Sequence, residues 1–388
     1  MKLPTAALAL LATFPALAQE HQGLRPLSPR AFSLGEDPAE WTRLDGLTDE
    51  LARQLPRASV LQVVADANRE GRPLGRSLDG IRIHTGFRWD RGDDAVEYWW
   101  PQGISGTAAA FPSESLGGKR ILLASWYFKR EESSSAVNKG VRVSFVDVTS
   151  MQRVRYRHVL LVEPTRDASG DASFRPVPIH AGGIAWVGRY LYAVDTTRGF
   201  RVFDTQRILR VSTGKRETIG RSGGRFYAFD YRYVLPQVGA YRLTGASADL
   251  RFSFVSVDRS TNPPSLLTGE YVKDAVDGKL ARWSFHPVSG LLEGAGAIHP
   301  AEVFVANQDR VQGALSWRGR FQLACSSQKI RRFRNHGRLY ATAPFTPSAA
   351  REWAYGPEDL TFTPSKGNLW SLSEYPGHRA VFAVKWTK

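Results

Sequence analysis

Short runs of alternating apolar and polar residues dominate the chain from about residue 82 onward. Examples are RILLASWYF, GVRVSFVDV, RYLYAVD, GFRVFD, RFQLACS and NLWSLSE, each bounded by Gly, Pro, Asp or Ser. A period of two, with many β-branched and aromatic residues, predicts antiparallel strands. Because helical spacing is scarce in this region, we predict an all-β domain: a barrel, a large sandwich, a solenoid or a propeller.

A recurring pattern favours one of these folds. A polar residue, then Gly or Asp, then a small apolar strand occurs in PQGISG, IHAGGIAW, VQGALSW and PEDLTF, with LRFSFVSV as a weaker fifth instance. Three more strand-like runs follow most of these starts. A repeated unit of four strands predicts a single β-propeller. Five starts indicate five blades, while six or seven remain open because LRFSFVSV also resembles VRVSFVDV, a different strand of the unit.

The chain before the first start is predicted to close the last blade. The unit that begins at Glu358 has too few strands, and HTGFRWDRGDDAVEYWW near residues 84–100 is expected to supply the missing one. That pairing would remove an open sheet edge. Residues 81–388 are then the propeller, and residues 19–80 are a lead-in that packs on it. LTDELARQL (47–55) predicts a helix with a Thr-Asp start, and SVLQVVADANREGR predicts a second helix or a strand.

The first residues read as an export signal. MKLPTAALALLATFPALAQE has one early Lys, a short apolar core and an Ala-Leu-Ala cleavage pattern. These features predict a signal peptide over residues 1–18, cut after Ala18, and a secreted protein. No later segment offers ~18 uninterrupted apolar residues, so we predict no membrane span. The single cysteine, Cys325, cannot form an intramolecular disulfide and is predicted to be buried in a strand.

The net charge points to a polyanionic partner. The formal charge is +15, which favours encounters with polyanions. Export makes acidic polysaccharides or other extracellular polyanions the expected partners, and nucleic acid is not expected. The densest cluster, QKIRRFRNHGR (328–338), carries five cations; it is either a solvated turn or an electrostatic rim for an acidic ligand.

The recurring polar positions are the candidate site. In a propeller the innermost strands begin near the central axis on one face, so the residues at their starts converge. They are Gln102, His180, Arg251, Gln312, Glu358 and Asp359. We predict His180 and Glu358 as acid–base groups and the other four as substrate ligands. Each has a plainer alternative: a turn residue, a structural amide or a partner in an ion pair.

Other chemistry is less visible in the sequence. Trp126 is predicted to stack on a sugar ring, with a core position as the alternative. The eight His residues are scattered, and HxH, HExxH and phosphate-binding motifs are missing from the sequence. We therefore predict no catalytic metal and no cofactor, and leave open a structural ion such as calcium on the axis.

Several longer motifs carry a family resemblance. VRVSFVDV, VLLVEP, VPIHAGGIAW, DTTRGFRVFD, YVLPQ, DRSTNP and GPEDLTF…LWSLSEYPG resemble a family of secreted proteins common in actinobacteria, many without an assigned function. The likeness covers most of residues 65–388. The fold also resembles secreted carbohydrate-active β-propellers, among them lyases that cleave rhamnosyl-glucuronate ends of plant gums. No catalytic residue is transferred on that basis.

These observations favour an enzyme acting on an acidic polysaccharide at the central opening. The chemistry is that of a polysaccharide lyase or a glycoside hydrolase, and the protein is expected to be a monomer. In a lyase, Arg251 would neutralise the uronate carboxylate, while His180 or a tyrosine would take the neighbouring proton. A non-catalytic propeller that binds glycans or envelope polymers, and a protein-interaction scaffold, are the alternatives.

Overall fold

Strands make up most of the regular structure. The computed structural model describes residues 23–245, 249–294, 296–326, 330–331 and 334–386, so the predicted signal peptide lies outside the described residues. The structure is 51% strand and 13% helix, which confirms the expected β class. The sheet nearly closes on itself in a barrel-like arrangement.

Five successive groups of antiparallel strands carry the fold, and we call them units 1 to 5. Unit 1 is β9 (Trp99–Gly106), β10 (Ile121–Phe128), β11 (Val141–Asp147) and β12 (Arg155–Arg166); unit 2 is β14 (Ile184–Val187), β15 (Tyr190–Asp195), β16 (Gly199–Asp204) and β20 (Tyr233–Thr244). Unit 3 is β21 (Phe254–Asp258), β22 (Ser265–Gly269), β23 (Lys279–Ser284) and β25 (Glu302–Val305); unit 4 is β26 (Val311–Trp317), β27 (Arg320–Cys325), β29 (Arg334–Ala343) and β30 (Thr346–Tyr355). Unit 5 is β31 (Pro357–Thr363), β32 (Asn368–Ser373), β33 (Ala380–Lys385) and β8 (Thr85–Arg88).

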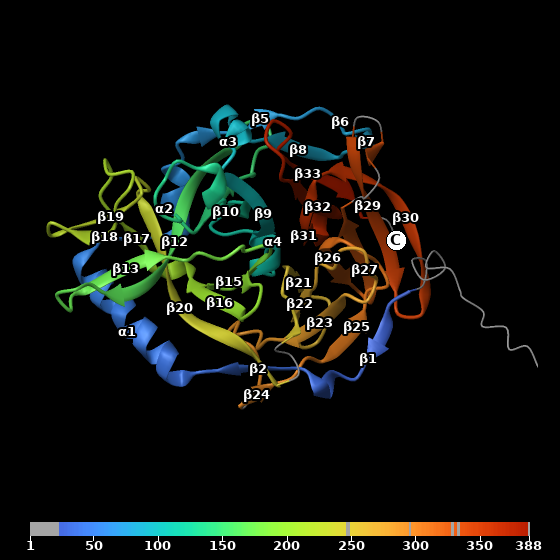
Figure 1. The fold of residues 1–388 in the computed structure, drawn as a ribbon. Helices are drawn as coiled ribbons and strands as arrows, with labels where there is room; N and C mark the ends of the chain where they lie inside the picture. The colour runs from blue at the N-terminus through green and yellow to red at the C-terminus, as the bar shows by residue number, and fades with distance from the viewer. Residues whose placement is uncertain (1–22, 246–248, 295, 327–329, 332–333, 387–388) are drawn as a thin grey trace, which may run out of the picture.

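The first strands of the five units meet at the centre. Each of β9, β14, β21, β26 and β31 contacts the next, and β31 contacts β9; β9, β21, β26 and β31 lie near the centre of Figure 1. Glycine makes this approach possible. A Cβ on Gly103 would lie 2.6 Å from the Ile184 nitrogen, and one on Gly313 would lie 2.7 Å from the Asp359 Cα. The recurring Gly of the sequence pattern therefore reflects close contact between neighbouring first strands.

Strand pairing between distant segments confirms one prediction and includes one pairing that was not predicted. As expected, the segment before β9 completes the last unit, because β8 pairs antiparallel with β33 from Ala380↔Arg88 to Ala383↔Thr85. The sequence pattern did not predict that β12 and β20, the last strands of units 1 and 2, would pair in parallel over Leu160–Val162. This pairing joins the two units into one sheet of 14 strands.

The N-terminal segment runs along the outside of the sheets (Figure 1). Strand β1 (Arg25–Leu27) pairs with β25, and β2 (Ser33–Glu36) pairs with β20. Helix α1 (Pro38–Gln54) follows. The predicted Thr-Asp helix start is wrong, because the side chain of Asp37 caps the helix by accepting from the Ala39 N–H, and Pro38 occupies the first turn. Asp and Pro at these two positions are a strong start signal.

The remaining elements are short. The helices are α2 (Val60–Ala65), α3 (Arg91–Ala95) and α4 (Thr107–Ala110), with 3₁₀ turns at Pro29–Ala31, Arg130–Glu132, Thr205–Arg207 and Pro364–Lys366. The further strands are β3 (Arg57–Ala58), β4 (Arg69–Glu70), β5 (Arg72–Pro73), β6 (Ser77–Leu78), β7 (Ile81–Arg82), β13 (Ala172–Pro176), β17 (Ile208–Arg210), β18 (Ile219–Ser222), β19 (Arg225–Ala228), β24 (Ala297–Ile298) and β28 (Ile330–Arg331). Helix α2 resolves the predicted choice between helix and strand in favour of helix.

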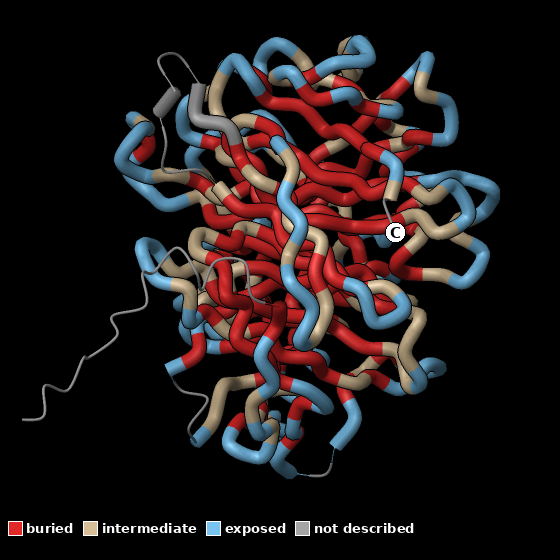
Figure 2. Tube along the Cα trace, turned by 90° about the vertical axis from the view of Figure 1, so that its right-hand side faces the viewer, coloured by how far each residue is buried: buried red, intermediate tan, exposed pale blue. Residues whose placement is uncertain are grey.

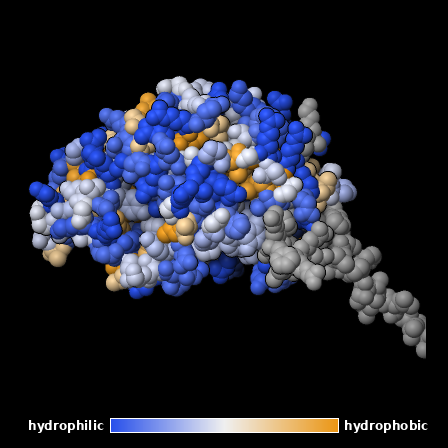
Figure 3. All heavy atoms as spheres, turned by 90° about the horizontal axis from the view of Figure 1, so that it is seen from above, coloured by the Kyte–Doolittle hydropathy of each residue, from blue (hydrophilic) through white to orange (hydrophobic). Residues whose placement is uncertain are grey.

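Most of the buried side chains belong to the strands of the sheets. Buried residues fill the interior and exposed residues lie at the periphery, as Figure 2 shows. The first strands are largely buried, whereas most of β30 is exposed or half-buried. Cys325 lies among apolar side chains in β27, as predicted, and burial raises the pKa of its thiol well above the usual range. The face seen in Figure 3 is mainly hydrophilic, with small hydrophobic groups. Among the described residues, no helix has the length and apolar character needed to cross a membrane.

The tight packing of the first strands gives a stability prediction. In Gly183→Ala the new Cβ would lie 2.2 Å from the Val255 nitrogen. Since backbone cannot move aside as a flexible side chain can, we expect the free energy of unfolding to fall by about 3 kcal/mol. Urea denaturation measures it. Gly75→Ala is the control, because nothing lies within 4 Å of its Cβ position; equal stability of the two variants would contradict the close approach.

Candidate functional site

One cavity lies where the first strands begin, and we call it the axial pocket. Its volume is about 520 Å³. Its lining comes from the starts of first strands and from the ends of second strands, which return to the same face. The lining residues are Gln102, His180, Thr196, Arg251, Ser253, Tyr271, Gln312, Glu358 and Glu374.

The structure brings together five of the seven residues predicted for the site. They are Gln102, His180, Arg251, Gln312 and Glu358, one from each unit. Polar residues that recur at one position of a repeated unit therefore do meet in space. The recurrence in the sequence is what made this set predictable.

Trp126 is not part of the pocket, and the prediction that it stacks on a sugar is wrong. The side chain is completely buried in the core of unit 1, and its indole N–H donates to the Ser144 Oγ at 2.8 Å. The faces of its ring contact the guanidinium groups of Arg142 and Arg379. Trp126 lies in β10, which is paired on both sides, with β9 and with β11. Its ring therefore has no open face for a ligand.

Asp359 also does not line the pocket, and the prediction that it binds substrate is corrected. It is fully buried at the position where other units have the recurring Gly. Its carboxyl group accepts from the backbone N–H groups of Leu360 at 2.9 Å and Ile104 at 3.3 Å, and from Ile184. The side chain thus joins the first strands of units 5, 1 and 2. Burial raises the pKa of this carboxyl despite those donors.

Glu374, which the sequence analysis did not single out, forms a carboxyl pair with Glu358. The two side chains hydrogen-bond to each other, and the Gln102 amide donates to the Glu374 Oε2 at 3.0 Å. Burial raises the pKa of Glu358 well above its usual range, and the neighbouring Glu374 charge adds to this. Burial raises the pKa of Glu374 to about 7, although Gln102 and Arg379 oppose the shift. At neutral pH the pair therefore holds at least one proton.

His180 supplies the complementary group. Its ring is exposed to the pocket and lies beside Tyr127, with ring centroids 4.4 Å apart. Partial desolvation lowers the pKa of the imidazole below its usual range. A neutral imidazole can accept a proton, so the pocket contains a potential base and a potential acid at the same pH.

Aromatic rings surround the carboxyl pair. Tyr375 hydrogen-bonds to Glu374 and stacks on Tyr355, with centroids 4.7 Å apart and planes at 30°. Desolvation raises the pKa of Tyr127 and of Tyr375, and the Glu374 charge raises both further. Both phenols are therefore protonated at neutral pH, and the Tyr375 hydroxyl can donate to Glu374.

Arg379 holds the end of β32 that carries Glu374. The guanidinium is fully buried. Its Nε donates to the Glu374 carbonyl at 2.7 Å, and its Nη1 donates to the carbonyls of Asp93 at 2.8 Å and Val96 at 2.6 Å. The side chain thus links α3 to the turn after β32. Arg379 is a positioning residue, because it contacts the Glu374 backbone and does not line the pocket.

The described residues offer no obvious metal site. No group of three or more His, Cys, Asp or Glu side chains among them is arranged to hold a metal ion. The predicted cationic segment 328–338 falls partly outside the described residues, so its role as a rim stays a prediction.

Comparison with known proteins identifies no family for this chain. No family model matches the chain, and no curated protein matches it. Among solved structures, Sqt1 from Chaetomium thermophilum is similar at a TM-score of 0.31 and 8% identity, covering 72% of this chain and 58% of Sqt1. Hydrazine synthase from Kuenenia stuttgartiensis gives a TM-score of 0.31 and 11% identity, covering 70% and 73%. The designed protein Ika8 gives 0.27 and 8%, covering 75% and 98%.

These likenesses are too distant to carry an argument about fold or function. The chain spans less than two thirds of the length of Sqt1. The resemblance to secreted actinobacterial proteins stays a prediction, and the function must be inferred from the pocket itself.

Proposed function

We propose that units 1 to 5 are the blades of a single five-bladed β-propeller. Two observations support this: the first strands contact one another in a closed ring, and an N-terminal strand completes the last unit. Six or seven blades would need further four-stranded units, and the described residues contain none beyond these five.

We propose further that the axial pocket is the active site of an exported enzyme that cleaves an acidic polysaccharide by β-elimination. The observation that carries the proposal is the meeting, in one pocket, of a neutral imidazole, a protonated carboxyl pair and an arginine. Elimination from a uronate needs these three kinds of group. The net charge of +15 suits a polyanionic substrate.

Each group has a role in the reaction. Arg251 pairs with the uronate carboxylate and so acidifies the neighbouring C5–H. His180 takes that proton, and the electron pair of the C–H bond forms the C4–C5 double bond as the C4–O bond breaks. Glu374 gives its proton to the leaving oxygen. The Gln312 amide and the Gln102 Oε1 bind sugar hydroxyls, because the Gln102 Nε2 already donates to the Pro101 carbonyl and to Glu374. Electrons and protons balance without a cofactor or a water.

The carboxyl pair favours elimination over hydrolysis. In retaining glycosidases the two carboxyl groups lie about 5 Å apart, and in inverting enzymes the gap is larger because a water must fit between them. Glu358 and Glu374 are instead hydrogen-bonded to each other. They act as one protonated unit on one side of a substrate, which suits a general acid and does not suit an acid facing a nucleophile.

The proposal is tested by following ultraviolet absorbance of the unsaturated uronate product. Gum arabic, pectic polymers and glucuronate polymers are the substrates, and a reducing-end assay detects hydrolysis separately. We expect elimination product from at least one of them. No product in either assay over this panel would contradict the enzyme.

Removal of the pocket cation should weaken substrate binding. In Arg251→Ala we expect kcat/KM to fall about tenfold or more, with KM raised and kcat lowered, because Arg251 both binds the uronate carboxylate and acidifies the C5–H. Arg251 is exposed, so the fold should be retained. Arg225→Ala is the matched control, since it removes the same charge from an exposed residue in β19, outside the pocket. Equal activity of both variants would argue against Arg251 as the carboxylate ligand.

A binding protein without catalysis is the second candidate. The His180 ring and Tyr271 in the pocket lining favour it, since aromatic faces hold sugar rings. This candidate predicts saturable, salt-sensitive binding to the same polymers with no product. A protein scaffold, the third alternative, predicts no glycan binding and a protein partner recovered from culture supernatant.

A further inference from the structure

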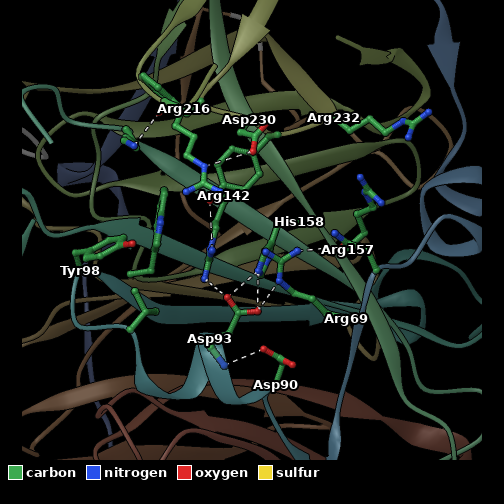
Figure 4. Close-up of a pocket in the computed structure, with 17 residues that line it drawn as sticks. Arg69, Asp90, Asp93, Tyr98, Arg142, Arg157, His158, Arg216, Asp230 and Arg232 are labelled. Atoms are coloured by element: carbon green, nitrogen blue, oxygen red, sulfur yellow. Dashed lines mark hydrogen bonds and ion pairs between the residues drawn. The ribbon is translucent and has the colours of Figure 1, made fainter. Parts of the chain in front are cut away.

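A second cavity lies outside the axial pocket, and we call it the arginine pocket (Figure 4). Its volume is about 450 Å³, within the usual range for small-molecule sites. It lies between α3, strands β11 and β12, and the segment that precedes β20. Its charged lining is Arg69, Asp90, Asp93, Lys139, Arg142, Arg157, Arg216, Asp230 and Arg232, and its aromatic lining is Tyr98, Trp99, Phe229 and Tyr231, with His158 at the floor.

The floor of the arginine pocket is a buried network of hydrogen bonds and ion pairs around Asp93. Asp93 is buried and accepts from Arg142 at 2.8 Å, from Tyr156 at 2.7 Å and from the His158 Nε2 at 3.0 Å, while Arg69 pairs with it at 3.0 Å. Although burial opposes its ionisation, these neighbours hold the pKa of Asp93 well below the usual range. Burial and the Arg142 charge lower the pKa of His158 to about 3, so this ring is neutral.

Cationic side chains outnumber carboxylates in the lining of the arginine pocket. Six cationic side chains line the cavity against three carboxylates, and the neutral His158 adds nothing. Two carboxylates outside the lining reduce the excess, because Glu217 pairs with Lys139 and Asp66 pairs with Arg157 and Arg232. Asp93 is shared between Arg69 and Arg142, so one carboxylate cannot neutralise both. Arg216 reaches toward Asp230 on the side opposite Asp93, as Figure 4 shows, and remains largely exposed at 86%. A concave site with excess positive charge concentrates anions.

The aromatic side chains make the site suitable for more than a bare ion. Tyr98 is exposed at the mouth, and Tyr231 is half-buried and hydrogen-bonded to Arg142 through its hydroxyl at 3.3 Å. Trp99 packs its face on the Arg142 guanidinium, 4.7 Å from the ring centroid. Rings beside cations suit a ligand that has an apolar face and an oxyanion on the same small body.

We infer that the arginine pocket binds an anionic monosaccharide, a sugar ring that carries a carboxylate or a phosphate. The oxyanion lies toward Arg216 and Arg142, and the ring lies toward Tyr98 and Tyr231. The inference does not depend on catalysis in the axial pocket, because the two cavities share no lining residue.

Calorimetric titration of the whole chain tests the inference. The probes are glucuronate, glucose 6-phosphate, inorganic phosphate and glucose. We expect saturable binding of at least one anionic sugar, weaker as salt is raised, with glucose and inorganic phosphate binding at least tenfold more weakly. The two anionic sugars distinguish a carboxylate from a phosphate ligand. Binding of glucose, or of inorganic phosphate alone, as tightly as either anionic sugar would overturn the inference.

Variants locate the binding. Arg216→Ala is expected to weaken the dissociation constant about tenfold, and Arg216→Glu more, because a charge-assisted bond is lost and then replaced by repulsion. Arg175→Ala is the matched control: Arg175 is also exposed and ion-paired, with Glu163, but lies outside the pocket. The titrations are repeated in Arg251→Ala to remove binding in the axial pocket. Unchanged affinity in both Arg216 variants in that background would overturn the inference even if the enzyme proposal stands.

Discussion

Glu374→Gln is expected to lower the rate of elimination on an acidic polysaccharide by about 100-fold or more, the usual range for loss of a general acid. The amide keeps the size of the side chain and can still bond Gln102, but it has no proton to give. Steady-state kinetics on the substrate identified by the absorbance assay measure kcat. Glu50→Gln, an exposed carboxylate that pairs with Arg166 away from the pocket, should leave kcat unchanged. Full activity in Glu374→Gln would exclude Glu374 as the acid.

The same residue sets a pH dependence. Burial raises the pKa of Glu374 to about 7, so activity should fall as the pH rises above about 7 and the acid loses its proton.

The free energy of unfolding should also fall as the pH rises. The raised carboxyl pKa stabilises the fold fully below the unfolded value of about 4.3, and this contribution is lost as the pH rises through about 7. Denaturant titrations between about pH 4 and about pH 7 measure the free energy of unfolding of wild type and of Glu374→Gln. The difference between the two values should shrink as the pH falls toward 4.

The second large effect is expected on stability. In Arg379→Ala the free energy of unfolding should fall by about 3 kcal/mol or more, because a buried guanidinium and its bonds to three backbone carbonyls are lost together. The Asp93 carbonyl is buried and the Val96 and Glu374 carbonyls are partly buried, and none of them has a donor in place of the guanidinium.

Urea denaturation measures this loss. Arg175→Ala, which removes a largely exposed arginine, should change stability little. Since Arg379 bonds the Glu374 carbonyl, kcat should fall as well, even under conditions where Arg379→Ala is fully folded. A loss below about 0.5 kcal/mol would show that the surrounding carbonyls find other partners.

The strands and their order followed from local patterns. Alternation of side chains with a period of two identified β10, β11 and β32 closely, because successive side chains of an extended backbone point to opposite faces of the sheet. The Thr-Asp pair at 48 and 49 resembles a helix start but lies inside α1, which begins at Asp37 and Pro38. Thr48 lies inside the helix, where its hydroxyl bonds the Leu44 carbonyl at 2.8 Å.

The candidate site could be predicted only as far as it repeats. Gln102, His180, Gln312 and Glu358 recur at one position of the unit, so the symmetry of the fold brings them together. Glu374 follows a second strand, as Glu270 does in unit 3, while Asp195 ends the second strand of unit 2. The pattern at the first strands does not include this position. It could have been found by noting that second strands run back to the same face.

The sequence by itself determined the β class, the repeat, the strand that completes the last unit and most of the axial pocket, because these depend on residue type and spacing. Only the tertiary structure decided which groups are ionised and which are accessible. Trp126 and Asp359 are buried, Glu358 shares a proton with Glu374, and His180 is neutral. Such properties arise from desolvation and from neighbours distant in sequence, which local pattern cannot convey.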